Sequence, residues 1–313
     1  MKFNKPKFWD KKSSFISIVL FPLTLIVLII NIIKKKITIT KKFNVPIICV
    51  GNIYIGGTGK TPLSIFLAKE LRKSGRNPVI LRKYYRNHID EHNLIRKNYE
   101  SLILSNNRIE GVKRSLESDY DSIILDDGFQ DYTIKKNLNI LCFNQNQLIG
   151  NGRVIPSGPL REGLSSLKRA HVVLINGKKD IKFETKILKI NKNLDIFYSS
   201  YVPMNLSNFK NKKILAVAGI GNPENFFQLM REYKLKIEKK LIFPDHYVFS
   251  KLEIENIIKE AERKDYQIVM TEKDYFKIGE YKSNKISYLK VLLKINSQDN
   301  LIKKINKLYD KKD

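Results

Sequence analysis

The stretch VPIICVGNIYIGGTGKTP, residues 45–62, limits the fold of this chain more than any other part of its sequence. It begins with a short apolar run rich in β-branched residues, which is typical of a buried parallel strand. Gly56, Gly57 and Gly59 follow, and after Thr61 apolar residues recur with helical spacing. A strand, a glycine loop and a helix in this order predict a parallel α/β sheet with a phosphate-binding loop.

The loop departs from the common nucleotide-binding pattern G-x-x-x-x-G-K-[ST] at its first position, where Tyr54 stands. The remaining chemistry is present, because glycines let backbone N–H groups approach a phosphate closely. Lys60 is of the type that reaches the β- and γ-phosphates, and the Thr61 hydroxyl is of the type that ligates magnesium. The predicted nucleotide-binding residues are Gly56, Gly57, Thr58, Gly59, Lys60 and Thr61.

A second strand-like run, YDSIILDDGFQ, ends in the paired acids Asp126 and Asp127. Acidic residues at the carboxyl end of a strand beside a phosphate loop commonly hold magnesium or its waters. Two adjacent carboxylates repel each other unless a cation lies near them. We therefore expect this pair to belong to the same site as the glycine loop.

The N-terminal run Phe15–Ile33 contains 19 residues without a charge, about the minimum length for a helix that crosses a bilayer. Lysines flank it at Lys2, Lys5, Lys7, Lys11 and Lys12, and at Lys34, Lys35, Lys36, Lys41 and Lys42. Because both flanks are basic, the positive-inside rule asks both to stay cytoplasmic. Pro22 favours a bend. We expect a membrane helix anchored in one leaflet of the cytoplasmic face, with a simple crossing as the second choice.

Composition adds little to this. The chain has 313 residues and 58 Lys and Arg against 31 Asp and Glu, a net charge of +27. Such an excess favours an anionic partner, although a lysine-rich compositional habit would produce it equally well. Cys49 and Cys142 end apolar runs and read as buried thiols without a disulfide framework or a metal cluster.

Strand-like and helix-like segments alternate along the chain, which predicts a P-loop kinase-like parallel sheet flanked by helices and a second, smaller α/β domain. Gly219 and Gly221 lack the third glycine of a dinucleotide fingerprint and read as a structural turn. The expected organisation is an N-terminal membrane-associated helix at 1–36, an ATP-binding domain at 37–177, and a second domain at 178–313 that closes an active-site cleft.

Several stretches together resemble the lipid A 4'-kinases, also called tetraacyldisaccharide 4'-kinases. They are VPIICVGNIYIGGTGKTP, LDDGFQDYTIKKNLNILCF, GNGRVIPSGPLRE, FPDHYVFS and MTEKDYFKI, spread from Val45 to Ile278. The resemblance implies ATP- and magnesium-dependent phosphorylation of the 4' hydroxyl of an acylated glucosamine disaccharide 1-phosphate. The implied partners are this lipid and the inner-membrane surface, on its cytoplasmic face. No nucleic acid and no obligate protein partner is expected.

The resemblance also implies roles for single residues. Carried over by motif, the residues that hold ATP are Gly57, Gly59, Lys60 and Thr61, and those that organise magnesium are Asp126, Asp127 and Glu162. The family's own phosphate loop lacks the first glycine as well, so Tyr54 does not count against the site.

For the general base, the resemblance points to Asp90 in HIDEHNLI, with His246 of PDHY as its partner. A carboxylate in reach of a sugar hydroxyl can take its proton, and a histidine can orient that carboxylate. The chain departs from the family nearby. It reads RKYYR at 82–86, where the family has roughly S-R-G-Y-G, so both glycines are lost and Lys83 replaces the arginine.

Two other classes remain open on sequence grounds. Membrane-surface partitioning ATPases of the Min and Par type also use G-G-x-G-K-T, but they carry a signature lysine where this chain has Ile55. A nucleic-acid-dependent ATPase would suit the positive charge, although no binding module is recognisable. Stimulation of ATP hydrolysis by DNA or by self-assembly would favour these classes over a glycolipid kinase.

Overall fold

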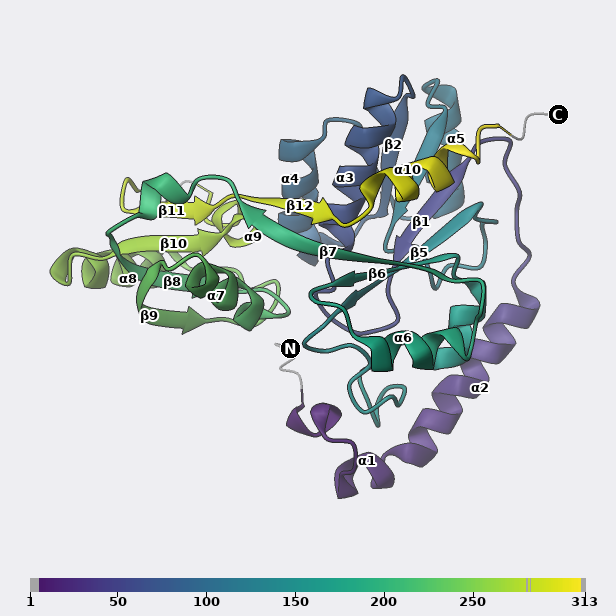
Figure 1. Ribbon diagram of the computed structural model, residues 1–313, viewed down its shortest axis with the longest axis horizontal. Coiled ribbons are helices and arrows are strands. Elements are labelled where there is room, and N and C mark those ends of the chain that lie inside the picture. Colours follow the sequence, from purple (N-terminus) through teal and green to yellow (C-terminus); the bar gives the residue numbers. More distant parts are fainter. Residues whose placement is uncertain (1–5, 280, 282, 311–313) are drawn as a thin grey trace. The chain divides into compact units, whose positions relative to one another are not determined.

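The structure, a computed structural model, describes residues 6–279, 281 and 283–310 (Figure 1). The chain forms two compact units, neither of which is continuous in sequence. Within the described residues, the large unit contains 6–84, 99–200 and 294–310, and the small unit contains 85–98 and 201–293.

The large unit is built on an eight-stranded sheet with the order β12-β7-β6-β5-β1-β4-β2-β3, of which the end of β7 and the start of β12 fall in the residues of the small unit. The strands are β1 (Ile47–Gly51), β2 (Pro78–Lys83), β3 (Leu102–Ser105), β4 (Ser122–Asp126), β5 (Leu138–Asn144), β6 (Val172–Asn176), β7 (Asp195–Pro203) and β12 (Val291–Ile295). All pairs from β7 to β3 are parallel. Because Val50 pairs with Asp126, the carboxyl ends of β1 and β4 meet at one edge of the sheet.

Helices cover both faces of this sheet, as its fully buried central strands require. They are α3 (Lys60–Lys73), α5 (Arg108–Glu117), α6 (Ile181–Leu188) and α10 (Gln298–Asn306), with the 3-10 turn η3 (Leu164–Arg169). The 3-10 turn η1 (Lys7–Asp10) instead contacts the loop after β5, because Asn151 N–H donates to the Trp9 carbonyl. All five residues of β1 are buried. Helix α3 buries Leu63, Leu67 and Leu71, which recur at the spacing of one helical face.

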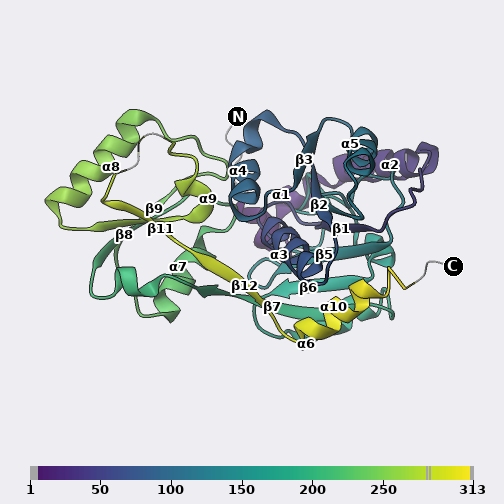
Figure 2. The same cartoon turned by 90° about the horizontal axis from the view of Figure 1, so that it is seen from above.

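The small unit has a parallel four-stranded sheet with the order β11-β10-β8-β9. Its elements are η2 (Arg86–His88), α4 (Ile89–Asn98), η4 (Leu206–Phe209), β8 (Lys213–Ala218), α7 (Pro223–Glu232), β9 (Lys236–Ile242), α8 (Lys251–Arg263), β10 (Gln267–Thr271), α9 (Glu272–Tyr275) and β11 (Ile286–Leu289). Helices α7 and α8 lie on opposite faces of the sheet (Figure 2). Alternate residues of β8 serve the two faces, since Ala216 packs with α7 while Leu215 and Val217 pack with α8.

The expected α/β architecture with a mostly parallel sheet is therefore present, but the units differ from the segments expected from sequence. The large unit runs on through 178–200, because β7 there extends its sheet beside β6. Residues 85–98 instead belong with the small unit. Helix α4 packs on α9 there, where Asn98 Nδ2 donates a 3.3 Å hydrogen bond to Glu272.

The uncharged N-terminal run does not form one continuous helix. It divides at Leu20 into α1 (Phe15–Val19) and α2 (Phe21–Ile37), since Pro22 stands in the first turn of α2 and suits a helix start. Among the residues that the structure describes, every helix is too short or too polar to traverse a bilayer. The second-choice expectation of a simple crossing therefore gains no support here, and anchoring in one leaflet stays a prediction.

Polar residues on one side of α1 and α2 hold them against the loop at 151–161. The Ser17 hydroxyl donates to the Ser157 carbonyl at 2.7 Å, and the Thr24 hydroxyl donates to the Ser157 hydroxyl at 2.8 Å. Both side chains are buried. The opposite side keeps its apolar residues exposed, at Phe15, Ile16, Ile18, Val19, Leu23, Leu25, Ile26, Ile29, Ile30, Ile32 and Ile33.

Candidate functional site

The glycine loop leads from β1 into the N-terminus of α3, as predicted. Gly59 precedes the helix in the left-handed conformation, with φ of +89°, and Gly56 has φ of +117°. Both values disfavour residues with a Cβ atom. The side-chain amide of Asn52 braces the loop by donating to the Gly56 carbonyl at 3.2 Å and to the Thr58 hydroxyl at 3.0 Å. A helix N-terminus of this kind presents backbone N–H groups to an anion.

Tyr54, which stands where the usual first glycine would be, has no exposed surface and belongs to the core of the large unit. Its neighbours in the loop pair with a second segment, because Ile55 N–H donates to the Pro159 carbonyl at 2.9 Å and Arg161 N–H donates to the Ile53 carbonyl at 2.7 Å. The loop is therefore anchored at its entry by core packing, and the large side chain of Tyr54 is accommodated there.

Lys60 and Asp127 form the charged part of the loop. The Lys60 ammonium lies 3.6 Å from one carboxylate oxygen of Asp127. The guanidinium of Arg161 donates to both oxygens of Asp127, at 2.9 and 3.2 Å. Burial lowers the pKa of Lys60, and the charge of Asp127 opposes that lowering. Burial alone would raise the pKa of Asp127, but Lys60 and Arg161 outweigh it and hold this pKa well below its usual range. Asp127 is therefore ionised.

Asp126, at the end of β4, has no exposed surface and accepts from three side chains. The hydroxyls of Thr61 and Ser64 each donate to it at 3.1 Å, and the guanidinium of Arg82 donates to the oxygen that Thr61 also contacts. Arg82 reaches it from the end of the neighbouring strand, because Arg82 pairs with Asp126 in the register of β2 and β4. This buried ion pair was not expected from the sequence.

Replacing Arg82 with alanine is expected to lower the free energy of unfolding by about 3 kcal/mol, since it leaves the carboxylate of Asp126 buried without its countercharge. Both side chains of the pair are less than 5% exposed, at 4% and 0%. Urea unfolding followed by circular dichroism measures the change. The matched control Lys113→Ala removes an exposed charge from α5 and should change stability by less than about 0.5 kcal/mol. Equal stability of the two variants would show that the pair contributes nothing.

Glu162 belongs to a separate network. Arg169 donates to both of its carboxylate oxygens, at 3.0 and 2.8 Å, and the Tyr132 hydroxyl donates at 2.9 Å. The Arg169 guanidinium also lies over the rings of Phe129 and Tyr132, 4.4 and 4.9 Å from their centres. Burial, followed by the charge of Glu162, raises the pKa of Tyr132 to about 12.

The residues predicted for magnesium fit that ion unequally. Thr61 and Asp126 place a hydroxyl and a carboxylate oxygen side by side at the helix N-terminus, which are hard donors of the kind Mg²⁺ prefers. Each of the three predicted carboxylates, Asp126, Asp127 and Glu162, is paired with an arginine. Among the described residues, the three carboxylates form no cluster with the spacing of metal ligands. The fit to magnesium therefore rests on Thr61 and Asp126.

Asp90 and His246 meet within the small unit, 156 positions apart in sequence. Nδ1 of His246 lies 3.1 and 3.0 Å from the two carboxylate oxygens of Asp90. Asp90 stands in the first turn of α4 and is only 4% exposed, while His246 lies in a loop after β9 in the left-handed conformation, with φ of +56°. The pairing implied by the family resemblance is thus present in the geometry.

Two lysines complete the surroundings of Asp90. The ammonium groups of Lys273 and Lys277 each lie 3.3 Å from the same oxygen of Asp90. Burial would raise the pKa of Asp90, but the hydrogen bond from His246 and the charges of both lysines hold it well below its usual range. These two lysines were not predicted from the sequence, although both lie in the MTEKDYFKI stretch.

Comparisons with known proteins agree on one family. The family model described as Tetraacyldisaccharide-1-P 4'-kinase matches residues 16–310. A tetraacyldisaccharide 4'-kinase of Pelagibacter ubique (strain HTCC1062) is 41% identical over 316 residues, covering 99% of this chain and 100% of the relative. One of Rickettsia bellii (strain OSU 85-389) is 32% identical, covering 98% and 99%.

Among solved structures, the crystal structure of LpxK from Aquifex aeolicus in complex with ATP superposes with a TM-score of 0.71. It is 23% identical and covers 93% of this chain and 99% of that one. At 23% sequence identity, this similarity supports a shared fold only.

Proposed function

This chain belongs to the tetraacyldisaccharide-1-P 4'-kinase family, and from that premise we propose that it transfers the γ-phosphoryl group of ATP to the 4' hydroxyl of an acylated glucosamine disaccharide 1-phosphate, a step of lipid A biosynthesis. The observation that carries the proposal is the start of α3, where Gly59 turns left-handed directly before Lys60 and Thr61. The two ATPase classes left open by the sequence gain no support from the family match.

The start of α3 is the proposed ATP site. Backbone N–H groups there and the positive end of the helix dipole favour a triphosphate. Lys60 lies at the same end and neutralises charge that builds on the γ-phosphoryl oxygens during transfer. The Asp127 carboxylate holds the Lys60 ammonium at 3.6 Å, which keeps the lysine oriented before the nucleotide arrives.

Magnesium is part of the proposal through Thr61 and Asp126, which would hold it. When bound, the ion supplies charge neutralisation between the phosphates. Asp127 and Glu162 stay predicted members of the metal site. The participation of any of the three carboxylates requires that its arginine moves away, namely Arg82 for Asp126, Arg161 for Asp127 and Arg169 for Glu162.

The acceptor hydroxyl must lose its proton as the phosphoryl group arrives, and the Asp90 and His246 pair is proposed as the acceptor of that proton. The depressed pKa of Asp90 keeps its carboxylate ionised and ready at neutral pH, although it also makes that carboxylate a weaker base. His246 bridges both oxygens of Asp90 and fixes the direction in which the carboxylate faces. Lys273 and Lys277 hold the same group in place.

The functional assay combines ATP, magnesium and the acylated disaccharide 1-phosphate in mixed micelles and scores a bisphosphate product. We expect product with this acceptor and none with an analogue that lacks the 4' hydroxyl. ATP hydrolysis that is indifferent to the glycolipid and rises with DNA would contradict the proposal and favour a nucleic-acid-dependent ATPase.

The exposed side of α1 and α2 is proposed to dock on the cytoplasmic face of the inner membrane, where the acylated substrate resides. Its apolar side chains are exposed in the described structure, and Lys34, Lys35 and Lys36 follow in the last turn of α2. An amphipathic helix with lysines beside its apolar face favours the surface of an anionic bilayer.

Replacing Ile26 and Ile30 together with glutamate is expected to lower binding to anionic phospholipid vesicles at least about tenfold, because two side chains lose their burial in lipid. Both are more than half exposed in the structure, at 53% and 56%, so the fold should tolerate the change. Vesicle sedimentation measures it. The matched control is Leu252→Glu, which alters a 71% exposed apolar residue of α8 in the small unit. Equal binding of the two variants would remove α2 from the docking surface.

A further inference from the structure

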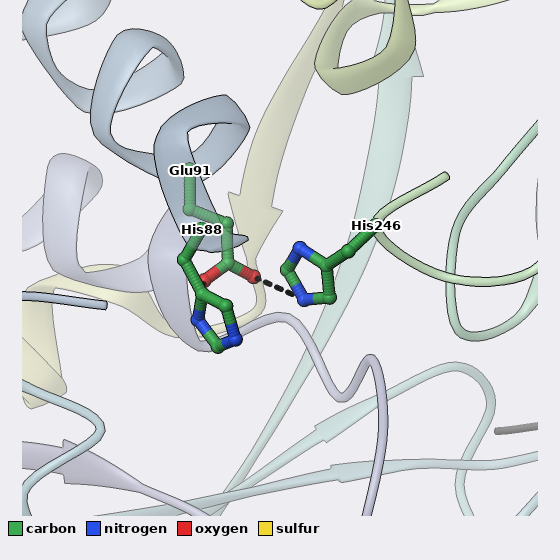
Figure 3. A group of neighbouring side chains, drawn as sticks. All are labelled: His88, Glu91 and His246. Carbon is green, nitrogen blue, oxygen red and sulfur yellow. Dashed lines mark ion pairs between the residues drawn. The ribbon is translucent and has the colours of Figure 1, made fainter. Parts of the chain in front are cut away.

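His88, Glu91 and His246 bring three potential metal ligands together in the small unit (Figure 3). One ligand atom from each lies within 4.8 Å of the others, and this is the one such group among the residues that the structure describes. Nδ1 of His88 is 3.5 Å from one carboxylate oxygen of Glu91, and Nε2 of His246 is 3.9 Å from the other. We propose that these three residues bind a divalent transition-metal ion of the zinc type.

The spacing of His88 and Glu91 in the sequence brings two of the three ligands together. His88 ends the η2 turn and Glu91 lies three positions later in the first turn of α4, so the two side chains project from the same side of one helical segment. The third ligand comes from the loop after β9, where the left-handed conformation of His246 turns its ring toward α4. The His88 and His246 rings stack with their centres 4.2 Å apart.

The orientation of His246 matches that of a metal ligand. Its Nδ1 faces the carboxylate of Asp90, which leaves Nε2 directed at Glu91. Metal-binding histidines usually donate their other ring N–H to a carboxylate in this way, which selects the tautomer and makes the ligand nitrogen more basic. Asp90 is therefore the outer partner of the site.

The chemistry of the three ligands favours a divalent ion with an affinity for imidazole. The carboxylates of Asp90 and Asp245 lie beside the three ligands, and Lys273 contacts both of them as well as Glu91. Two imidazoles and one carboxylate suit zinc, whereas magnesium requires oxygen ligands.

Binding requires a small rearrangement. Zinc bonds to nitrogen and oxygen are about 2.0–2.2 Å long, so the ligands must close around the ion. The stacked rings lie 9° from parallel, and the His88 ring must turn until its nitrogen converges with Nε2 of His246. His88 is the most exposed of the three side chains, at 31%, and can turn at the surface of the unit.

A consequence for catalysis rests on the proposed function. Zinc on Nε2 places a fixed positive charge beside the Asp90 and His246 pair and lowers its ability to accept a proton. The site would then let zinc inhibit the kinase reversibly. The binding itself does not depend on the reaction.

The test is titration of the full chain with Zn²⁺ alone by calorimetry, with His88→Ala and Glu91→Gln as site variants. We expect one ion per chain and a loss of affinity of at least about tenfold in each variant, comparable with the 10- to 100-fold losses known for weaker perturbations of metal sites. The matched control is His171→Gln, which removes an exposed histidine of the large unit and should leave the affinity unchanged. Thermal unfolding with and without Zn²⁺ confirms that each variant is folded.

Co²⁺ offers a second readout that excludes the thiols. Burial raises the pKa of Cys49 to about 11 and that of Cys142 to about 12, so neither is a ready ligand. The Co²⁺ spectrum should therefore lack thiolate charge-transfer bands. Absence of a stoichiometric site, a thiolate spectrum, or equal effects of the His171 and His88 variants would overturn the proposal.

Inhibition of the kinase by zinc separates the proposed metal site from the proposed role of His246 in catalysis. The rate of each variant with zinc is compared with the rate of the same variant without zinc. We expect His88→Ala to raise the inhibitory zinc concentration at least about tenfold. If zinc binds at these residues without slowing phosphoryl transfer, the metal site stands and the proposed role of His246 fails.

Discussion

We expect the replacement of Lys60 with alanine to lower kcat by about 10³-fold and to change the apparent affinity for ATP less than that. The physical reason is that the ammonium group neutralises charge that develops on the transferring phosphoryl group, in a site where water is scarce. Its side chain is only 12% exposed, so solvent screens it little. Formation of the bisphosphate in the mixed-micelle assay measures the loss.

Lys69→Ala is the matched control for this prediction, because it removes an exposed lysine from the same helix. It should retain wild-type turnover. If Lys60→Ala retained more than about a tenth of the rate, the start of α3 would not be where the γ-phosphoryl group is transferred.

Asp90→Asn is expected to lower kcat by about 10²- to 10⁴-fold, which is the usual contribution of a positioned proton acceptor to the rate. The amide keeps the size of the carboxylate but has no charge with which to take a proton or hold the ring of His246. His246→Asn should lower kcat as well, and the double variant should lose less than the product of the two single losses, because the pair acts as one unit.

Asp265→Asn is the matched control, since it makes the same change at an exposed carboxylate of the small unit. A wild-type rate for Asp90→Asn would assign proton removal to another group.

Acid unfolding provides an independent test of the ionised state of Asp90. Because the folded-state pKa of Asp90 is depressed, its contribution to stability is present above about pH 4 and is lost as the pH falls. Asp90→Asn should therefore lose less stability than wild type on acidification.

Local patterns were enough to predict the large unit's central features. The apolar run before Gly56 forms β1, Lys60 begins α3, and Asp126 ends the neighbouring β4. Each of these depends on residues close together in sequence, where hydrophobic periodicity and glycine conformations act directly. The fold class followed from the alternation of such segments.

The pairing of Asp90 with His246 could not be predicted from local patterns, because 156 positions separate them. The family resemblance alone suggested it. The arginines that hold the acids were not predicted at all. Arg82 contacts Asp126 only because β2 and β4 lie next to each other in the sheet, and Arg161 and Arg169 depend on how a long loop returns to the strands.

By itself, then, the amino-acid sequence determined a phosphate-binding loop between a buried strand and a helix, an α/β sheet and the family to which the chain belongs. Only the tertiary structure decided that Tyr54 is part of the core, that the uncharged N-terminal run divides into two helices, and that 85–98 join the small unit. Strand, turn and helix preferences depend on residues close together in the sequence, whereas these outcomes depend on which surfaces from distant parts of the chain pack against each other.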